Sequence, residues 1–334
     1  MPARERLGPI APAVDQTFDD LRSRRALARM RSGDHTLWQE DPTEVADRLG
    51  WLVVGEQVRA ELDVARARIA GRAQSALLGM GGSSLFPEVL NRTFRHPGSL
   101  AVLDTTDPAA IGRVVVDGTT FVAASKSGTT VETTSQLAHF WEATGAKGDA
   151  FVAITDPGTK LAALGAERDF AAVFENRPDI GGRYSALSWF GMVPALLLGI
   201  DAERLLERAA AVDDADGLRL AAVLGASARA GRDKLTLVLP SQLASFGLWL
   251  EQLVAESTGK HGTGIVPVAG EALGAPDSYG DDRLFVAIGP DGVVRSQLDA
   301  LAAAGHPVVE LHLTDTYDLG ALVVTWEIAI ALSG

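Results

Sequence analysis

Short, almost unbroken runs of apolar residues recur along two stretches of the chain. In the first stretch they occupy residues 75–78, 100–103, 121–124, 151–154 and 171–174. In the second stretch they occupy residues 235–239, 265–268, 284–288 and 308–311. Runs of this kind are typical of parallel strands that are covered on both faces, because half-exposed strands alternate apolar and polar residues. The pattern therefore predicts two mainly parallel sheets.

Segments with helical spacing lie between these runs. Asp41 has the features of a helix N-cap, with Pro42 at the first helical position and Glu44 at the third, which predicts a helix over residues 42–69. Apolar residues spaced three and four apart predict further helices that begin near residues 130, 188 and 243, and a closing helix over 319–332. Strands that alternate with helices in this way indicate an α/β fold.

The order of these elements predicts four parts. They are an N-terminal helical segment (1–72), a first α/β domain (73–200), an alanine-rich helical connection (201–232) and a second α/β domain (233–334). The similar layout of the two domains suggests a structural duplication. Open parallel sheets bind ligands at the carboxyl ends of their strands, and pockets are common at domain interfaces. We therefore expect a ligand between the two domains.

Composition narrows the classes of partner. The chain has 334 residues, enough for two domains with cores of their own, and it is 47% hydrophobic and 22% charged, as globular proteins are. Its formal net charge of −13 argues against a nucleic-acid partner. The apolar runs at 190–200 and 321–332 are interpreted as too short to span a bilayer, so no membrane partner is expected. The arginines within 22–31 are interpreted as a solvated helix face, with a subunit contact as the alternative.

The residue types that bind metals are scarce. The chain contains no cysteine, so a disulfide or a thiolate metal site is impossible. Its six histidines form no HxH or HExxH pattern, and we therefore expect no metal site. The absence of cysteine fits a reducing compartment, and we expect a cytoplasmic protein.

Residues 125–130 read SKSGTT and lie between a predicted buried strand and a predicted helix. The hydroxyls of Ser125, Ser127, Thr129 and Thr130 and the ammonium of Lys126 therefore gather at a helix N-terminus. Free backbone N–H groups and the positive end of the helix dipole favour an anion there, and hydroxyls add neutral donors. The spacing is not that of a GxxxxGK[ST] loop. The predicted ligand is the phosphate of a small molecule, and an ordinary polar loop is the alternative.

Residues 252–260 read QLVAESTGK and lie at the end of the helix predicted from residue 243. Gln252 and Glu256 are four residues apart, so their side chains share a helix face. The carbonyl end of a helix disfavours negative charge, and a carboxylate in that position suits a general base. Taken alone, the segment favours the alternative interpretation, a solvated surface glutamate.

Two glycine-rich turns complete the set of candidate segments. GMGGSSLFP at 79–87 follows a predicted strand, and GGRYS at 181–185 precedes the helix predicted from residue 188. Glycine lets the backbone approach a ligand closely, and Arg183 brings a planar positive fork. The first turn is not a GxGxxG dinucleotide loop, because Ser84 stands where the third glycine is required.

Together, and in this order, the four segments resemble the motifs of the glucose-6-phosphate isomerase family, part of the double sugar-isomerase-domain superfamily. GMGGSSLFP resembles the family's first glycine loop, SKSGTTVET its phosphate loop, GGRYS its arginine signature and QLVAESTGK its catalytic-glutamate helix. WQEDPTEVADRLGWL, at 38–52, is similar to the isomerase part of transaldolase–isomerase fusions. The resemblance implies two αβα-sandwich sugar-isomerase domains with mainly parallel sheets.

The resemblance also implies a role for each matching residue. Glu256 would be the base that carries a proton between C1 and C2 of the substrate, and Arg183 would stabilise the enediolate. Gln252 would line the same pocket. The phosphate would be surrounded by Gly82, Ser83, Ser125, Lys126, Ser127 and Thr130. Proton abstraction next to a carbonyl needs a carboxylate base and a positive group for the oxyanion, so we expect no metal and no organic cofactor.

The chain departs from the family pattern in two places. The family carries a histidine, proposed to help open the sugar ring, in a segment of the form G-x-P-x-x-x-G-Q-H. Residues 274–282 align with that segment and place Asp282 at the histidine position, where we expect it to take the catalytic role. The family also ends in an asparagine- and proline-rich segment with a catalytic lysine, and this sequence stops at Gly334, before that lysine.

The expected function is that of an aldose–ketose isomerase of glycolysis and gluconeogenesis, which interconverts glucose 6-phosphate and fructose 6-phosphate. One alternative is a non-catalytic sugar-phosphate-binding module. Another is an isomerase that also accepts mannose 6-phosphate. The expected partner is a small sugar phosphate. We also expect a homodimer, because the family's equivalent loop completes the site of the neighbouring subunit.

Overall fold

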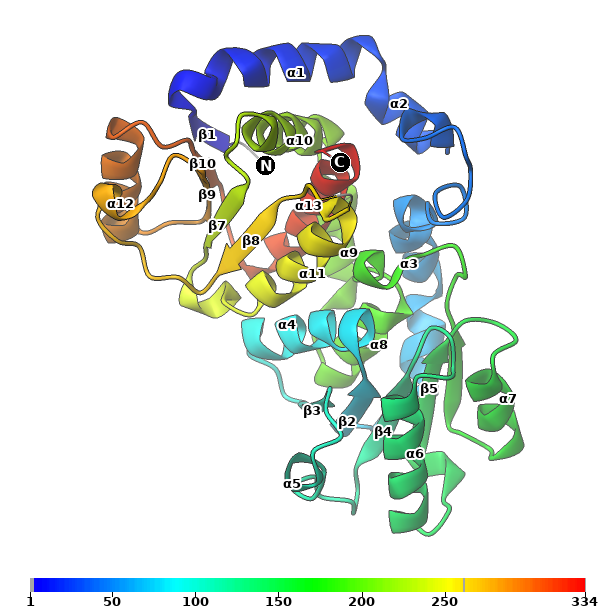
Figure 1. Cartoon of the computed structure of the whole chain (residues 1–334). Helices are drawn as coiled ribbons and strands as arrows, with labels where there is room; N and C mark the ends of the chain where they lie inside the picture. The colour runs from blue at the N-terminus through cyan, green and yellow to red at the C-terminus, as the bar shows by residue number, and fades with distance from the viewer. Residues whose placement is uncertain (1–2, 261, 334) are drawn as a thin grey trace. The chain divides into compact units, whose positions relative to one another are not determined.

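The computed structural model describes residues 3–260 and 262–333 (Figure 1). The chain divides into two compact units. Unit 1 contains Met1–Ala46 and Glu207–Gly334, and unit 2 contains Asp47–Leu206. This division differs from the four parts expected from the sequence, since the segment 1–72 and the connection 201–232 are each shared between the units. The reason is tertiary: strand β1 (Ala3–Arg6) pairs with β10 (Val308–Leu311) in unit 1, and α1 (Ala11–Ser23) packs on α10 (Asp214–Arg229).

Unit 2 is built on a five-stranded parallel sheet with the order β3-β2-β4-β5-β6. Its strands are β2 (Gln74–Gly79), β3 (Ser99–Leu103), β4 (Thr120–Ala124), β5 (Phe151–Thr155) and β6 (Ala172–Glu175). Their ends lie within one residue of the predicted apolar runs. β4 and β5 are buried along their whole length, as their apolar sequences require.

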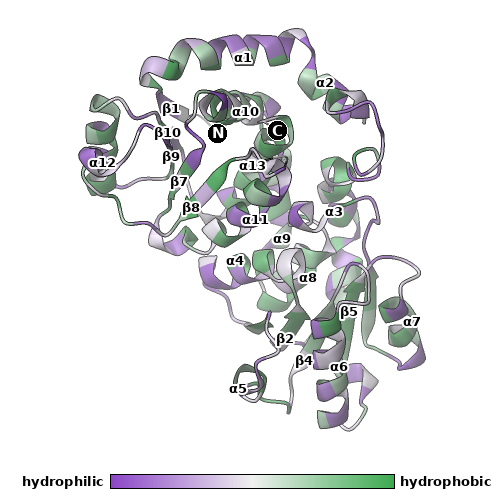
Figure 2. Ribbon diagram, in the orientation of Figure 1, coloured by the Kyte–Doolittle hydropathy of each residue, from purple (hydrophilic) through white to green (hydrophobic). Residues whose placement is uncertain are grey.

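Helices cover both faces of this sheet. Helices α6 (Val131–Ala143) and α7 (Lys160–Glu167) pack on one face, where Phe121 stacks on Phe140 with ring centroids 4.3 Å apart. Helices α4 (Leu85–Thr93) and α8 (Trp189–Leu198) contact β3, and α3 (Trp51–Arg68) packs against α8. Figure 2 shows hydrophobic residues along the strands and hydrophilic residues on α6 and α7. Unit 2 is therefore an αβα sandwich, completed by the short helix α5 (Pro108–Ile111).

Unit 1 repeats this arrangement with a different edge. Its strands β7 (Lys234–Val238), β8 (Val266–Ala269) and β9 (Arg283–Ile288) are parallel to β10, in the order β8-β7-β9-β10-β1. The first four strands of each sheet thus have the same spatial order, second-first-third-fourth, which is the duplication suggested by the sequence. The fifth place belongs to β1, which runs antiparallel and was not predicted. The prediction of an α/β fold with mainly parallel sheets is confirmed.

The helices of unit 1 also form layers. Helix α12 (Gly292–Ala303) packs on one face of the sheet through Leu298 and Leu301. Helix α11 (Phe246–Thr258) contacts β8, and α13 (Leu319–Ser333) lies against both α10 and α11. Helix α2 (Ala26–Arg31) follows α1, and α9 (Ala202–Ala210) spans the boundary between the units.

Helix α13 is more apolar than the sequence interpretation allowed. The stretch Thr316–Ser333, which contains the predicted run 321–332, has 18 residues, and by length and composition alone it is long and apolar enough to cross a membrane. In the structure 67% of this stretch is buried, and its packing against α10 and α11 accounts for its apolar character. Glu327 is buried within it, and desolvation raises the pKa of its carboxyl well above the usual value.

The helix predicted from residue 42 begins later, at Trp51. The side chain of Asp41 does accept a hydrogen bond from the backbone N–H of Thr43, at 2.9 Å, but this bond closes only a turn. Glu44, the next residue, has a φ of 60°, a left-handed conformation that ends the turn. The N-cap pattern at Asp41 therefore correctly predicted a hydrogen-bonded turn, but the prediction of a helix that starts there is wrong.

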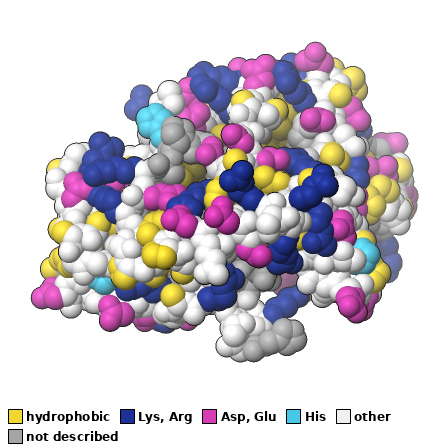
Figure 3. Space-filling model, turned by 90° about the horizontal axis from the view of Figure 1, so that it is seen from above, with side chains coloured by type: hydrophobic (Ala, Val, Ile, Leu, Met, Phe, Trp, Pro, Cys, Tyr) yellow, Lys and Arg dark blue, Asp and Glu magenta, His cyan; other side chains and the backbone are white. Residues whose placement is uncertain are grey.

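Arginines at the end of α1 and within α2 have acidic partners within unit 1. Arg24 lies 3.7 Å from Asp20, and Arg31 lies 2.6 Å from Asp214. The face in Figure 3 shows Lys and Arg side chains interspersed with Asp and Glu. These pairs agree with the interpretation as a solvated helix face.

Candidate functional site

The carboxyl ends of the unit 2 strands carry the segments singled out in the sequence. Four of the loops that leave this edge matter for the site: residues 80–84 after β2, 125–130 after β4, 156–159 after β5 and 176–184 after β6. We call residues 125–130 the phosphate loop and residues 176–184 the arginine loop. Seven of the ten candidate residues lie on these loops, and the other three, Gln252, Glu256 and Asp282, belong to unit 1.

The phosphate loop forms the entry to α6, a helix of 13 residues. Ser125 is only 2% exposed, and its hydroxyl shares a hydrogen bond of 2.8 Å with the hydroxyl of Thr130, the N-cap residue. The hydroxyl of Ser127 accepts hydrogen bonds from the backbone N–H and the hydroxyl of Thr129, at 3.2 and 3.0 Å. Because the first-turn N–H groups of a helix lack partners within the helix, this is an anion-binding geometry.

Gly128 sets the course of the phosphate loop. Its φ is 65°, and a Cβ at this position would come within 2.8 Å of the Cβ of Thr159, the N-cap of α7. A side chain would therefore meet both backbone strain and a steric clash. Glycine allows the loop to pass directly beside the start of α7.

Lys126 does not extend away from the edge. Its ammonium forms an ion pair with the carboxylate of Asp156 and donates a hydrogen bond to the carbonyl of Pro178, at 2.7 Å. Asp156 follows β5, and Pro178 belongs to the arginine loop. Burial raises the pKa of the Asp156 carboxyl, and the neighbouring Lys126 ammonium opposes this shift. Lys126, which we predicted to bind phosphate, therefore contacts the loops that follow β5 and β6.

The two glycine-rich turns pack against each other. A Cβ on Gly82 would lie 2.2 Å from the carbonyl oxygen of Gly182, so the backbones are too close for any side chain at residue 82. A Cβ on Gly79 would lie 3.3 Å from the Cβ of the half-buried Ser83. We expected the backbone at these glycines to approach a ligand. At Gly82 it approaches the backbone of the arginine loop instead.

Arg183 follows this contact directly. It lies in the single turn Gly182–Tyr184, with its guanidinium carbon 5.5 Å from the centre of the Tyr184 ring. The Tyr184 ring is itself 5.0 Å from that of Trp51 at the start of α3. Ser188, the N-cap of α8, holds the other end of the segment by accepting a hydrogen bond from the N–H of Phe190. The base of Arg183 is thus fixed by packing on both sides.

In unit 1, Gln252 and Glu256 share a face of α11 as predicted. The side-chain amide of Gln252 donates a hydrogen bond of 3.0 Å to the carboxylate of Glu256, and Glu256 is exposed on this unit. The helix ends at Thr258, whose hydroxyl accepts a hydrogen bond from the N–H of Ile265 just before β8. Glu256 therefore lies toward the amino edge of the unit 1 sheet.

Asp282 lies at the same edge, immediately before β9. Its carbonyl accepts a hydrogen bond from the N–H of Lys234, and its carboxylate lies 3.2 Å from the Lys234 ammonium. The carboxylates of Asp233 and Asp282 raise the pKa of Lys234. The contact found for Asp282 is thus an ion pair at a partly exposed position.

The family model described as phosphoglucose isomerase matches residues 69–265. The chain belongs to this family. The match covers the phosphate loop, both glycine turns and Glu256, and it ends before Asp282, where the chain departs from the family's histidine segment. The resemblance drawn from the four motifs is confirmed.

Curated relatives are named as glucose-6-phosphate isomerases. The chain is 32% identical over 273 residues to the glucose-6-phosphate isomerase of Rubrobacter xylanophilus, which covers 72% of this chain and 62% of that protein. It is 35% identical over 250 residues to the probable glucose-6-phosphate isomerase of Haloarcula marismortui, which covers 68% and 56%. This phosphoglucose isomerase family member thus spans about three fifths of the length of these two relatives.

Solved structures share the fold. A hypothetical protein from Thermus thermophilus superposes with a TM-score of 0.81 and 23% identity, covering 100% of this chain and 94% of that one. A glucose-6-phosphate isomerase from Chlamydia trachomatis superposes with a TM-score of 0.72 and 18% identity, covering 96% and 81%.

Asp156 also lies at the carboxyl edge of the unit 2 sheet, and none of the four sequence motifs includes it. It is 9% exposed, and its backbone N–H donates a hydrogen bond to the carbonyl of Lys126, at 3.2 Å. A usable signal was present, because Asp156 follows the apolar run 151–154 after one residue, and Ser125 follows the run 121–124 directly. The carboxyl ends of neighbouring parallel strands meet at one edge, and that rule places the two residues together.

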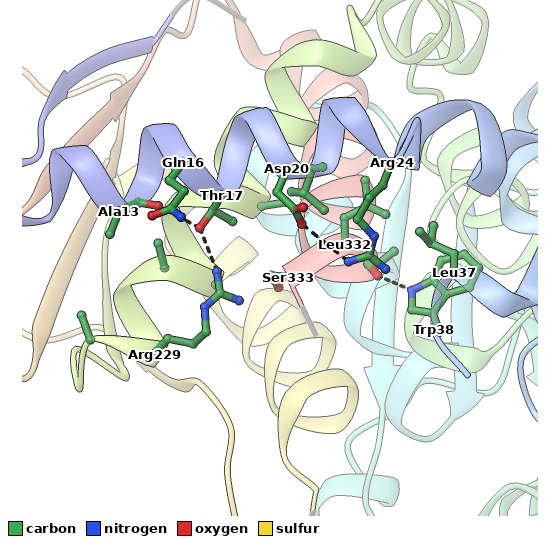
Figure 4. Close-up of a pocket in the computed structure, with 16 residues that line it drawn as sticks. Ala13, Gln16, Thr17, Asp20, Arg24, Leu37, Trp38, Arg229, Leu332 and Ser333 are labelled. Atoms are coloured by element: carbon green, nitrogen blue, oxygen red, sulfur yellow. Dashed lines mark hydrogen bonds and ion pairs between the residues drawn. The ribbon is translucent and has the colours of Figure 1, made fainter. Parts of the chain in front are cut away.

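A pocket of about 770 Å³ in unit 1 lies under α1, against α10 and the end of α13 (Figure 4). Arg229 donates a hydrogen bond to the hydroxyl of Thr17, and the indole N–H of Trp38 donates one to the carbonyl of Ala331. None of the ten candidate residues lines it. Within residues 3–260 and 262–333, no group of three or more His, Asp or Glu side chains could hold a metal ion.

Proposed function

We propose that this chain interconverts glucose 6-phosphate and fructose 6-phosphate through an enediolate. The observation that carries the proposal is the phosphate loop, where hydroxyls and the first-turn N–H groups gather at the start of α6, at the same sheet edge as the arginine loop. A phosphate monoester matches the first feature, and an oxyanion that develops during reaction matches the second. The names of the relatives agree with both.

In the proposed reaction the carboxylate of Glu256 removes the proton from C2 of the open-chain aldose. The carbonyl at C1 becomes the oxyanion of an enediolate, and Arg183 stabilises this charge. A proton then passes from O2 to O1, a ketone forms at C2, and the protonated Glu256 returns its proton to C1. Gln252, which donates to the Glu256 carboxylate, orients it. No electron leaves the substrate, so the route itself consumes no cofactor.

The proposal extends to the setting of the enzyme. A glycolytic and gluconeogenic role in the cytoplasm fits the proposed substrate and the absence of cysteine. A homodimer is proposed from the family resemblance, in which a loop completes the neighbouring subunit's site. Asp282 is proposed to assist ring opening at the position of the family's histidine.

A coupled isomerase assay and a binding measurement on the same sample test the function. We expect fructose 6-phosphate to bind and to turn over. Binding without turnover would identify a sugar-phosphate-binding module instead. Turnover of mannose 6-phosphate at a comparable rate would identify the broader isomerase.

A further inference from the structure

The ammonium of Lys126 connects three loops at the carboxyl edge of unit 2. It pairs with the carboxylate of Asp156 after β5 and donates to the carbonyl of Pro178 after β6, while Lys126 itself follows β4. The main chain repeats the link, because the carbonyl of Lys126 accepts from the N–H of Asp156 at 3.2 Å. The bonds to the carboxylate and to the carbonyl engage two of the three N–H donors of the ammonium and hold it between the loops after β5 and β6.

The carboxylate of Asp156 is buried and pairs with Lys126. One of its oxygens pairs with Lys126, and the other is buried without a hydrogen-bond partner among the described residues. Burial raises the pKa of Asp156, so the carboxylate depends on Lys126 for its compensation. The carboxylate of Asp179 and the guanidinium of Arg48 also act on it through space.

The second contact of the Lys126 ammonium is with Pro178 of the arginine loop. Pro178 lies between Arg177 and Asp179, whose side chains form an ion pair, and the carbonyl of Asp179 accepts from the N–H of Gly50 at 2.9 Å. Arg183 follows five residues after Pro178, and Gly182 is pressed against Gly82. Lys126 therefore fixes one end of the loop that carries Arg183, and the glycine contact fixes the other.

We propose that Lys126 and Asp156 are positioning residues that hold the arginine loop for catalysis, and that the Lys126 ammonium is not a phosphate ligand. The proposal rests on the proposed function, in which Arg183 stabilises the enediolate. Loss of the pair then weakens a transition-state contact more than it weakens ground-state binding of phosphate.

The test uses the full chain with Lys126→Met, Asp156→Asn and the double variant. We expect Lys126→Met to lower kcat by up to about 100-fold, as small displacements of catalytic groups do, with KM and the dissociation constant of inorganic phosphate changed by less than about threefold. Asp156→Asn, which keeps the shape of the side chain, should lower kcat similarly. The double variant should be no slower than the slower single one, because the residues act as one unit.

Three controls separate the outcomes. Lys147→Met removes an exposed lysine from the same unit and should leave kcat unchanged. Ser125→Ala should weaken inorganic phosphate binding, because this hydroxyl lies in the phosphate loop. Amide hydrogen exchange of residues 176–184 should accelerate in Lys126→Met and stay at the wild-type rate in Lys147→Met.

Two results overturn the proposal. One is a tenfold or greater loss of inorganic phosphate affinity in Lys126→Met with kcat unchanged. The other is unchanged hydrogen exchange of residues 176–184 in both Lys126→Met and Asp156→Asn. The exchange measurement does not require turnover, so it decides the proposal even if the wild-type chain proves inactive as an isomerase, a result that would refute the proposed function alone.

Discussion

Glu256 and Asp282 are the two carboxylates for which chemistry was expected, and their surroundings differ. Glu256 accepts a hydrogen bond from a neutral amide, that of Gln252, and is exposed on unit 1. Asp282 lies 3.2 Å from the ammonium of Lys234, with side chains 42% and 38% exposed. A carboxylate paired with an ammonium, such as that of Asp282, gives up a Coulombic contact when it takes up a proton.

The ring-opening hypothesis for Asp282 has a direct test. It predicts that Asp282→Ala slows turnover of the cyclic substrate much more than turnover of a substrate held in the open-chain form, because only the cyclic form needs ring opening. Asp281→Ala, which alters the exposed neighbouring carboxylate, is the matched control. Equal losses on both substrates would assign Asp282 to its ion pair with Lys234 instead.

Among the elements, the contact between the two glycine turns makes the sharpest steric demand. We expect Gly82→Ala to destabilise the protein by about 1–3 kcal/mol, because its Cβ would lie 2.2 Å from the carbonyl oxygen of Gly182 and the loops must separate. Gly181→Ala is the matched control, since a Cβ there meets nothing within 4 Å and its φ of −69° suits alanine. Its unfolding free energy should change by less than about 1 kcal/mol. Equal stability of both variants in denaturant unfolding would contradict the packing described.

Helix α13 carries a buried carboxyl that makes stability depend on pH. Desolvation raises the pKa of Glu327 well above 4.5, so the folded state favours the neutral acid. The resulting stability is present below the unfolded pKa and is lost as the pH rises through the folded pKa. Glu327→Gln is neutral throughout. As the pH rises from below 4.5 through the raised pKa of the folded state, the wild-type Tm should therefore fall relative to that of Glu327→Gln.

Thermal unfolding across this pH range is the measurement for Glu327. Glu167→Gln, which changes an exposed glutamate, should follow the wild type. Parallel curves for the wild type and Glu327→Gln would show that folding does not raise the pKa of this carboxyl, and so that it is not buried as described.

Elements whose signal is local were predictable, and elements that depend on distant contacts were not. The parallel strands lie within one residue of their predicted bounds, because short apolar runs bounded by turn residues are typical of strands covered on both faces. β1 was missed because Arg4, Glu5 and Arg6 read as polar chain, and only pairing with β10 makes them a strand. The ion pair of Asp156 with Lys126, 30 residues away, depends on the pairing of β4 with β5; a rule for parallel strands could place the two segments together, but not the contact between the two side chains.

At the scale of the whole molecule, the two units share a topology but differ in the loop that follows the third strand. The third strand of unit 2 leads into the phosphate loop, whereas the third strand of unit 1, β9, leads through Gly289, Pro290 and Asp291 into α12. The second loop has no hydroxyl, and Asp291 caps its helix with a carboxylate. A carboxylate at a helix N-terminus occupies the place of an anion. Of these two loops, that of unit 2 is therefore the one at which phosphate chemistry is expected, and unit 1 contributes the proposed base.

The central claim is that Glu256 carries the substrate proton between C2 and C1. Glutamine has nearly the same shape as glutamate but cannot accept that proton, so Glu256→Gln should fold and bind sugar phosphate while losing turnover. Loss of a general base typically costs about 10²–10⁴-fold in rate, and a sole proton carrier should fall at the upper end. Glu251→Gln, on the same helix, is the matched control.

The most direct measurement is exchange of the C2 hydrogen of glucose 6-phosphate with deuterated water, followed beside turnover in the wild type, Glu251→Gln and Glu256→Gln. We predict that exchange and turnover collapse together in Glu256→Gln and persist in Glu251→Gln. Retention of more than about a tenth of the wild-type rate in Glu256→Gln, a loss below ~1.4 kcal/mol of transition-state stabilisation, would show that another group is the base.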